Sequence, residues 1–425
     1  MVFLKAKKRC NFSNNFNLKK KITIIGINYF PEDTAIGLYT TQLAEYLYQN
    51  EIEVTVVTGF PYYPAWRINE EYKFKKTFLQ ENINGIKILR YKQYVPKNPN
   101  FIKRIFHLID FSIGTFINIL KVKNTDVVLC IVPFIGTVFL GKILSKIKGA
   151  KLWVHIQDFE FDAVSDSNII ENKTNDGIFF KFLFWIEKKL LKSADFLSTI
   201  SSSMIFKLNQ KLKNKINNKK LLPNWVDANF IKPDDYKEHK YLKSSKFKIL
   251  YSGNIGEKQD WEFFIEFVKL LAPEQDIEII VVGNGSKRIW LEEKLLDLDN
   301  IYFYSPVKYS QLSNLLCSAD LHILFQKDEV IDTVMPSKIL AMMSSQKPSI
   351  ITGNLKSEVA SIIKESKGGK YFETQSINNI LDFVLELKDN VILQKEYGKN
   401  AREYVIQNYS KNKILNQFKN TFNNL

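Results

Sequence analysis

The sequence predicts an α/β protein built from two tandem Rossmann-like domains with parallel sheets. Short apolar segments typical of strands alternate along the chain with longer segments whose apolar residues recur at helical spacing. A segment with proline and asparagine punctuation, LLPNWVDANFIKP at 221–233, is typical of a linker, and the alternation starts again after it. Glycine-containing loops follow two of the strands in the second half, as is common where sheets bind ligands at the carboxyl ends of their strands.

The first half opens with a strand–helix–strand unit. KITIIGINYF (21–30) predicts a strand, LYTTQLAEYLYQN (38–50) a helix and EVTVVTGF (53–60) a second strand, with the polar loop PEDTAIG (31–37) between the first two. Such a unit joins parallel strands, because only a crossover helix returns the chain to the same end of the sheet. Further strands are predicted in this half at 126–133, 151–157 and 196–201.

The second half repeats this organisation. Its predicted strands lie at 247–253, 277–283, 301–307, 321–326 and 348–353. The expected division of the chain is a basic extension (1–20), a first domain (21–222), a linker (223–246), a second domain (247–390) and a helical segment (391–425) that folds back across the first domain. Ligands of such sheets lie beyond the carboxyl ends of the strands, so we expect the site in a cleft between the domains.

Composition limits the class of protein. The 425 residues include 60 lysines and arginines against 45 acidic residues, a net charge of +15 that favours anionic partners, although an AT-rich genome explains frequent lysine equally well. Cys10, Cys130 and Cys317 are far apart and the four histidines do not cluster, so we expect a reduced, cytosolic chain without a structural metal. Neither a signal peptide nor a membrane-spanning apolar run is present, which predicts a protein that is soluble or bound to a membrane surface.

Three loops of the second half are candidates for binding an anion. YSGNIGEKQDWEFFIEF (251–267) places Gly253, Gly256 and Lys258 before a helix, whose first N–H groups have no partners and whose dipole is positive there. VVGNGSKRIW (281–290) has Gly283 and Gly285 at a strand end, followed by Lys287 and Arg288.

The third loop, VMPSK (334–338), presents Ser337 and Lys338 at a helix N-terminus. An ordinary strand-to-helix turn or ordinary capping explains each of these loops taken singly. Together they predict a pocket for a nucleotide diphosphate.

A dense polar group follows a strand of the first half. WVHIQDFEFD (153–162) contains His155, Asp158, Glu160 and Asp162, and we expect these side chains to face the cleft. An isolated histidine is usually structural, but the carboxylates beside it favour a functional role.

Taken in order, these stretches resemble glycosyltransferase family 4, which has the GT-B fold of two Rossmann-like domains facing a deep cleft. The resemblance covers about residues 21–410, and it is strongest to the bacterial subfamily of colanic acid and O-antigen fucosamine-type transferases. Its landmarks are INYFPEDTAIGLYTTQLAEYL, GFPYYP, HIQDFEFDA, STISSSM, LPNWVD, YSGNIGEKQ, VVGNGSKR and MPSK…QKP.

The resemblance implies retaining transfer of a sugar from a nucleotide-sugar donor without a metal or other cofactor. The expected donor is UDP-linked and carries N-acetylfucosamine or a related 6-deoxy amino sugar. The expected acceptor is a saccharide on undecaprenyl diphosphate, for capsule, O-antigen or exopolysaccharide synthesis. The protein would then work in the cytoplasm, held peripherally at the anionic cytoplasmic face of the inner membrane.

The resemblance also assigns site residues. The implied catalytic residues are His155, Asp158 and Lys258. The implied donor-binding residues are Gly37, Gly253, Asn254, Lys258, Gly283, Gly285, Arg288, Gln326, Ser337 and Lys338. The implied acceptor-binding residues are Tyr29, Glu32, Asp33, Tyr39, Tyr62, Glu160 and Asp162.

The sequence departs from the family pattern at three positions. Asn254 occupies the place of a common arginine, and Thr333 and Ala341 occupy the places of two glutamates. We expect Lys338 or Arg288 to supply the missing positive charge.

Two stretches mix aromatic and aliphatic residues with lysine and arginine, FIKRIFHLIDFSIGTFINILKVK (101–123) and IFFKFLFWIEKKLLK (178–192). Basic amphipathic helices of this kind favour anionic lipid surfaces. The alternative is that both are core-facing helices of the first domain.

Two other classes of function remain open at this point. A nucleotide-sugar epimerase of the UDP-GlcNAc 2-epimerase class has the same two-domain shape and needs no acceptor, although the family landmarks argue against it. The net charge alone suggests a nucleic-acid binder, but no recognition motif accompanies it, so no nucleic-acid partner is expected.

Overall fold

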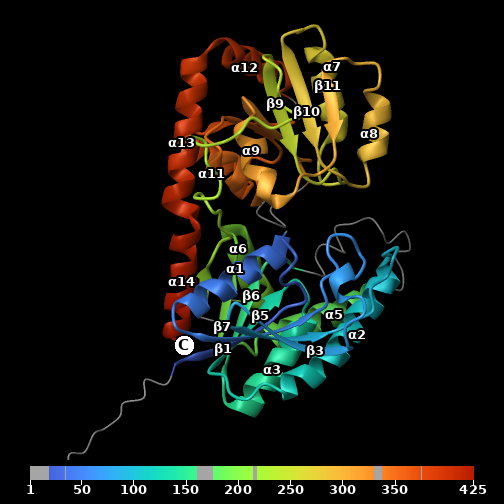
Figure 1. Cartoon of the computed structure of the whole chain (residues 1–425), viewed down its shortest axis with the longest axis vertical. Coiled ribbons are helices and arrows are strands. Elements are labelled where there is room, and N and C mark those ends of the chain that lie inside the picture. Colours follow the sequence, from blue (N-terminus) through green and yellow to red (C-terminus); the bar gives the residue numbers. More distant parts are fainter. Residues whose placement is uncertain (1–18, 34, 160–175, 214–217, 330–336, 375) are drawn as a thin grey trace, which may run out of the picture.

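The computed structural model describes residues 19–33, 35–159, 176–213, 218–329, 337–374 and 376–425. These residues form two α/β lobes, one above the other in Figure 1, joined by the linker and by the C-terminal helices. The sheet of the first lobe has the strand order β3-β4-β2-β1-β5-β6-β7-β8. Its strands are β1 (Lys21–Ile25), β2 (Glu53–Gly59), β3 (Phe78–Ile83), β4 (Ile86–Tyr91), β5 (Val127–Val132), β6 (Lys151–Ile156), β7 (Phe196–Thr199) and β8 (Lys219–Leu221).

All neighbouring strands of this sheet are parallel except β3, which pairs antiparallel with β4. This hairpin was not predicted, although Asn84–Gly85 is a strong hairpin signal. Both residues have positive φ (53° and 85°), as a tight turn of that kind requires. β3 is an edge strand without buried residues, so its sequence lacks the apolar run that marked the other strands.

Helices cover both faces of the first sheet. α1 (Ala35–Gln49) lies on one face together with the last helix of the chain, α14 (Lys411–Asn423). The other face carries α2 (Phe101–Leu120), α3 (Gly136–Lys148) and α5 (Asp176–Leu191), with α3 in contact with both of its neighbours. α6 (Ser202–Leu212) packs on β7 and β8, and the short helix η1 spans Glu70–Tyr72.

The sheet of the second lobe is entirely parallel, with the order β11-β10-β9-β12-β13-β14. Its strands are β9 (Phe247–Ser252), β10 (Ile277–Val282), β11 (Ile301–Tyr304), β12 (Leu321–Phe325), β13 (Ser349–Thr352) and β14 (Gly369–Phe372). Its helices are α7 (Trp261–Leu271), α8 (Arg288–Lys294), η2 (Tyr309–Gln311), α9 (Leu312–Cys317), α10 (Ser337–Ser344), α11 (Glu358–Ser366) and α12 (Ile377–Asp389). The fold prediction, α/β with two Rossmann-like units of the GT-B type, is confirmed.

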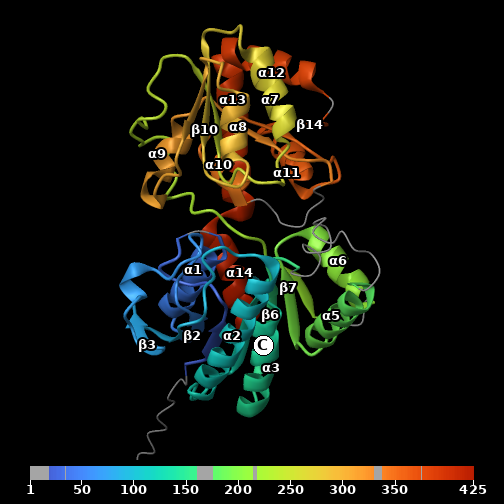
Figure 2. The same cartoon turned by 90° about the vertical axis from the view of Figure 1, so that its right-hand side faces the viewer.

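The chain passes between the lobes twice, and the two passages are joined. The long helix α13 (Val391–Tyr409) runs along one side of the molecule and leads into α14 on the first lobe (Figures 1 and 2). Val226 of the linker donates to the Tyr409 carbonyl and accepts from Lys411 N, both at 3.0 Å. Lys411 Nζ also lies 3.1 Å from Asp227 Oδ2, so the passages form one connected joint.

Candidate active site between the lobes

A pocket of about 540 Å³ lies between the two lobes, at the carboxyl ends of strands from both sheets. Its first-lobe wall contains Asp33, Leu38, Tyr39, Gln42, Tyr63 and Pro64. Its second-lobe wall contains Ser252, Gly253, Asn254, Val282, Gly283, Asn284, Pro306, Val307, Tyr309, Leu312, Leu315, Leu316, Lys338 and Ala341, and the linker contributes Trp225, Val226, Asp227, Phe230 and Ile231. Most of the lining is apolar side chain or backbone, with few charged groups to orient a ligand.

Two glycines bring the β9 and β10 loops into direct contact. A Cβ atom on Gly283 would lie 1.9 Å from the Gly253 carbonyl oxygen, and one on Gly285 would lie 2.2 Å from the Ile255 carbonyl oxygen. Hydrogen bonds follow from this approach, from Ile255 N to the Asn284 carbonyl at 2.9 Å and from Lys287 N to the Ile255 carbonyl at 3.1 Å. The predicted glycine loops are therefore close-packed, and Gly253, Asn254 and Gly283 line the pocket, whereas Gly285 does not.

Lys338 is the lysine that enters the pocket from the second lobe. It is the second residue of α10, and its ammonium group packs over Gly253, 3.5 Å from the Tyr251 hydroxyl and 5.4 Å from the centre of that ring. Burial lowers the pKa of Lys338 to about 8. Burial thus disfavours the charged form of this amine, and a bound anion would favour it. The side chain of Ser337 lies outside the described part of the structure.

Lys258 lies elsewhere than expected. It is exposed, does not line the pocket, and its carbonyl accepts from Lys327 N at 3.3 Å. The helix that follows begins only at Trp261, and its N-terminus is capped by Asp260, whose carboxylate accepts from Phe263 N at 3.1 Å. The expected anion position at the start of α7 is thus filled by the protein's own carboxylate, because Asp260 is an ordinary N-cap.

Arg288 and Gln326 also lie outside the pocket lining. Arg288 Nη1 donates to the carbonyls of Gly283 (2.6 Å) and Tyr304 (3.0 Å), and Arg288 Nε donates to Glu292 (2.8 Å). In this arrangement the guanidinium joins the ends of two strands. It is therefore not available to replace the positive charge of the family arginine whose place Asn254 occupies. Gln326 forms a bridge with Gln259 behind the β9 loop.

On the first-lobe wall, Asp33 and Tyr39 line the pocket as predicted residues of the acceptor side. Asp33 is exposed. Tyr39 packs edge-on against Trp225 with ring centres 5.1 Å apart, and Trp225 Nε1 donates to Gln42 Oε1 at 2.6 Å. The linker is therefore fixed against α1 at the side of the pocket.

Glu32 is buried, joins two loops through its hydrogen bonds, and does not line the pocket. One carboxylate oxygen accepts from the backbone N–H groups of Tyr62 and Tyr63, both at 2.8 Å, and the other accepts from Asn28 Nδ2 at 2.9 Å. Burial raises the pKa of Glu32, and these three donors oppose that shift. Gly37 is buried against it, since an added Cβ would lie 2.8 Å from Glu32 Cβ. Both residues position the wall instead of forming it.

Tyr29 and Tyr62 are likewise buried, at 3% and 7% exposure, so neither predicted acceptor ligand reaches the pocket surface. Tyr62 packs edge-on against Trp66 and His107. Its neighbour Tyr63, which was not among the predicted site residues, is 40% exposed and lines the pocket in its place.

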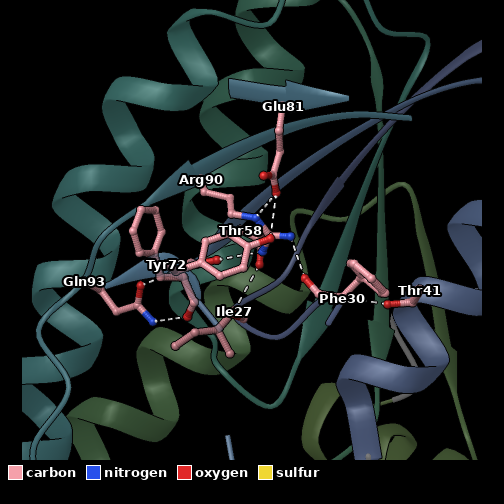
Figure 3. A network of polar contacts seen from close by, with 10 residues as sticks. Ile27, Phe30, Thr41, Thr58, Tyr72, Glu81, Arg90 and Gln93 are labelled. Atoms are coloured by element: carbon pink, nitrogen blue, oxygen red, sulfur yellow. Dashed lines mark hydrogen bonds and ion pairs between the residues drawn. The ribbon is translucent and has the colours of Figure 1, made fainter. Parts of the chain in front are cut away.

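A buried arginine supports the same loops (Figure 3). Arg90 is fully buried, pairs with Glu81, and donates to the carbonyls of Gly59 (3.2 Å) and Phe30 (2.5 Å). Its guanidinium also lies over the rings of Tyr29 and Tyr72. No sequence pattern pointed to Arg90, because a single arginine in an edge hairpin predicts a solvated residue.

His155 is a core residue of the first lobe. Its ring is 1% exposed, with Nδ1 2.9 Å from Ser198 Oγ and Nε2 3.0 Å from Gln157 Nε2, and it packs edge-on against Phe418 of α14. Burial lowers the pKa of His155 to about 3. The structure therefore corrects its expected place in the cleft: His155 belongs to β6, where alternate side chains point to the covered face.

Of the other members of this polar group, the structure describes Asp158. Asp158 follows β6, is half-buried and has interaction partners of its own, but it is not among the residues that line the pocket. Glu160 and Asp162 lie outside the described residues.

The far end of the second-lobe wall was not predicted. Pro306, Val307 and Tyr309 lie there with Phe230 of the linker, and the rings of Phe230 and Tyr309 are stacked 4.5 Å apart at 4°. A flat aromatic and aliphatic surface of this kind suits a planar base. Isolated apolar residues after a strand carry no sequence signal for such a role.

The fold and the pocket define an enzyme class, the GT-B glycosyltransferases. A family model described as "Glycosyl transferases group 1" matches residues 246–390. A colanic acid biosynthesis glycosyl transferase of Escherichia coli K12, WcaI, is 32% identical over 413 residues, which cover 94% of this chain and 99% of that protein. The chain therefore belongs to this family of glycosyltransferases and is a transferase.

Solved structures agree in fold. Sucrose-phosphate synthase from Thermosynechococcus elongatus superposes with a TM-score of 0.73 at 13% identity, over 96% of this chain and 99% of that one. HepE from Anabaena, solved in complex with UDP and glucose, superposes with a TM-score of 0.66 at 13% identity, over 96% and 100% of the two chains.

Proposed function

We propose that this enzyme transfers a sugar from a UDP-sugar to a saccharide acceptor during synthesis of a surface polysaccharide. The observation that carries the proposal is the interdomain pocket, which combines Lys338, the closely packed glycine loops and a stacking surface at Tyr309. The Escherichia coli relative named for colanic acid biosynthesis supports the polysaccharide role, and the UDP-bound HepE structure supports a nucleotide-sugar donor.

The pocket suggests how the donor is held. The uracil base would rest on the apolar end formed by Val307, Tyr309 and Phe230, and the diphosphate would reach Gly253 and Lys338 at the start of α10. A bound diphosphate restores the full positive charge of Lys338, since two negative phosphates favour its protonated form. That charge would be preorganised for the leaving UDP, where charge develops in the transition state.

The proposed reaction retains the configuration of the sugar. The bond from the anomeric carbon to the phosphate oxygen breaks and UDP leaves with that electron pair. An acceptor hydroxyl forms the new bond on the same face, and its proton passes to the departing phosphate. Asp158, just beyond β6, would lie on the side of the transferred sugar. We propose no metal for this step because Lys338 and the α10 N-terminus supply the positive charge.

The finer assignments extend the family resemblance. We propose N-acetylfucosamine or another 6-deoxy amino sugar as the transferred group and a saccharide on undecaprenyl diphosphate as the acceptor, bound along Asp33, Tyr39 and Tyr63. A lipid-linked acceptor requires that the enzyme work at the cytoplasmic face of the inner membrane. Among the described residues, no helix is long and apolar enough to cross a membrane.

A panel of UDP-, GDP- and dTDP-sugars tests the donor. We expect a UDP-sugar to give the largest thermal shift, and UDP release to require a lipid-linked acceptor and to continue in EDTA. Epimerisation of free UDP-sugar without any acceptor would instead assign the enzyme to the epimerase class. Loss of activity in EDTA would contradict the metal-independent step.

A further inference from the structure

A second hollow lies on the surface of the first lobe, between α3 and α5. It has a volume of about 580 Å³ and shares no lining residue with the interdomain pocket. Its walls are Phe134, Ile135, Gly136, Phe139, Ile143, Trp185, Ile186 and Leu190, with Lys142, Lys146 and Lys189 at the same surface. We call this hollow the α3–α5 groove.

The groove and its surroundings expose large apolar side chains. Phe139 is 52% exposed and Trp185 54% exposed, and Phe182 stacks on Trp185 with ring centres 6.0 Å apart. The neighbouring helix α2 adds a ridge at near-helical spacing, formed by Ile102, Phe106, Ile109, Ile113, Phe116, Ile117 and Leu120, all at least 40% exposed. Figure 1 shows α2, α3 and α5 together on the lower lobe. An exposed apolar surface of this extent marks an interaction site.

The charged groups at the groove are all cations. None of Lys142, Lys146 and Lys189 forms an ion pair with another described residue, and Lys189 Nζ lies 4.8 Å from the centre of the Trp185 ring. α3 contains no acidic residue. Glu187 of α5 is buried and holds Lys211 Nζ at 2.8 Å. The partner that complements this surface is therefore both apolar and anionic.

We propose that the α3–α5 groove binds an anionic phospholipid at a bilayer surface, with an acyl chain along the groove and the headgroup phosphate at the three lysines. The stretch of α3 that lines the groove runs from Gly136 to Lys146, so it extends roughly 15 Å at 1.5 Å per residue. One leaflet of hydrocarbon is also roughly 15 Å thick. A lysine-flanked apolar surface with aromatic residues is the chemistry that binds such an interface.

The groove also has a structural connection to the acceptor wall. Phe134, at the start of the groove, packs against Phe111 with ring centres 6.1 Å apart, in an apolar cluster that includes Tyr62. Tyr63, the next residue, lines the interdomain pocket. A phospholipid in the groove would thus hold the acceptor wall close to the membrane surface. This consequence rests on the proposed function, in which the acceptor is carried by a membrane lipid.

Vesicle binding by the full chain tests the lysines. We expect co-sedimentation with phosphatidylcholine vesicles that contain phosphatidylglycerol, and little with phosphatidylcholine alone. Lys142→Glu with Lys146→Glu should weaken binding to the anionic vesicles at least tenfold. The matched control, Lys294→Glu with Lys364→Glu on exposed positions of the second lobe, should leave binding unchanged.

Brominated acyl chains test the apolar part. They should quench the fluorescence of the wild-type protein more than that of Trp185→Phe, which keeps an aromatic ring and should still bind the vesicles. Equal binding to neutral and anionic vesicles, an unchanged affinity of the α3 double variant, or equal quenching of both proteins would overturn the proposal. A dimer in gel filtration that the α3 double variant abolishes would also overturn it, in favour of a second copy. The vesicle assays contain no sugar substrate, so a failure to bind vesicles can be told apart from a failure to transfer a sugar.

Discussion

At the residue scale, Lys338 gives the proposed donor site a pH dependence. Burial lowers the pKa of Lys338 to about 8, and a bound diphosphate should raise it. UDP binding near pH 8 should therefore take up protons, and the affinity should fall as the pH rises above 8. Calorimetry in buffers of different ionisation enthalpy measures the uptake.

Two variants separate the roles of the lysines. Lys338→Arg should bind UDP without proton uptake, because guanidinium stays charged. Lys338→Ala should lower turnover by roughly two to three orders of magnitude, the usual loss for one preorganised donor. Exposed Lys258→Ala should have a much smaller effect. A larger loss of turnover in the Lys258 variant would show that the diphosphate binds at the loop after β9 instead.

Glu32 should act on the acceptor without touching it. In Glu32→Gln a single side-chain oxygen remains, so it can accept either from Tyr62 N and Tyr63 N or from Asn28, but not from both sides. Hydrogen bonds to a charged group contribute ~1.5–3 kcal/mol each to stability. Because Tyr63 lines the pocket, we expect the KM for acceptor to rise about tenfold while UDP affinity stays the same. Steady-state kinetics measures both, with exposed Glu53→Gln as the control. A change in UDP affinity alone would refute the assignment to the acceptor wall.

Asp158 tests the division of labour between the lobes. It follows the β6 strand of the first lobe, whereas the nucleotide is assigned to the second. Asp158→Asn should then lower turnover strongly and leave UDP binding nearly unchanged. Titration of UDP against the variant, together with its turnover, decides this: a tenfold loss of UDP affinity with a normal rate would contradict it.

The same residues show what a sequence can predict about a site. Gly253, Asn254, Gly283, Lys338, Asp33 and Tyr39 were all predicted and all line the pocket. Of the predicted residues that do not line the pocket, one group is buried in the protein: Glu32, Tyr29, Tyr62 and His155. Others differ, since Lys258 is exposed and Arg288 holds the ends of two strands. Tyr62 and Tyr63 are neighbours in the loop after β2, where no periodic pattern tells a buried side chain from an exposed one, and Tyr63 is the one that lines the pocket.

At the scale of elements, the contact between the β9 and β10 loops makes Gly283 sensitive. In Gly283→Ala the new methyl group would meet the Gly253 carbonyl at 1.9 Å, so the two loops must separate. Overpacking of this kind costs ~1–3 kcal/mol, and the displaced loop forms the donor wall. We expect a lower Tm and at least tenfold weaker UDP binding.

The matched control is Gly26→Ala, whose nearest neighbour would be at an ordinary 3.5 Å. It should keep both the Tm and the UDP affinity of the wild type. If Gly283→Ala behaved in the same way, the loop contact would have no part in donor binding.

Interior strands with a continuous apolar run were mostly predicted, and strands at sheet edges were mostly missed. The ten predicted strands all exist, because central parallel strands are continuously apolar. β3, β8 and β14 were missed, and they lie at sheet edges, where side chains alternate or are more exposed. β4 was missed as well, although it is an interior strand whose side chains are mostly buried. α2 and α5 each bury one face in the first lobe, as core-facing helices do, and expose apolar residues on the other; binding to a lipid surface stays a prediction.

At the scale of the whole molecule, the last helix makes the first lobe depend on residues that follow the second. Ile414, Leu415, Phe418 and Phe422 of α14 are buried with β1, β6 and α1. Phe418 stacks on Trp153 with ring centres 5.7 Å apart and meets Trp225 edge-on at 5.8 Å. Trp225 lines the interdomain pocket, so one side chain joins the core of the first lobe to the wall of the site.

Phe418→Ala should therefore affect stability and function together. Removing a fully buried phenyl ring lowers the free energy of unfolding by about 3–5 kcal/mol. The cavity would also let the Trp225 ring move, close to the point where the linker is hydrogen-bonded to the C-terminal helices. We expect a large drop in the free energy of unfolding and, in the fraction that stays folded, a higher KM for acceptor. Ile406→Ala on α13, 42% exposed, is the control and should change neither. The variant could instead lose the predicted stability and keep normal acceptor kinetics. That result would show that α14 stabilises the first lobe but does not position the pocket wall.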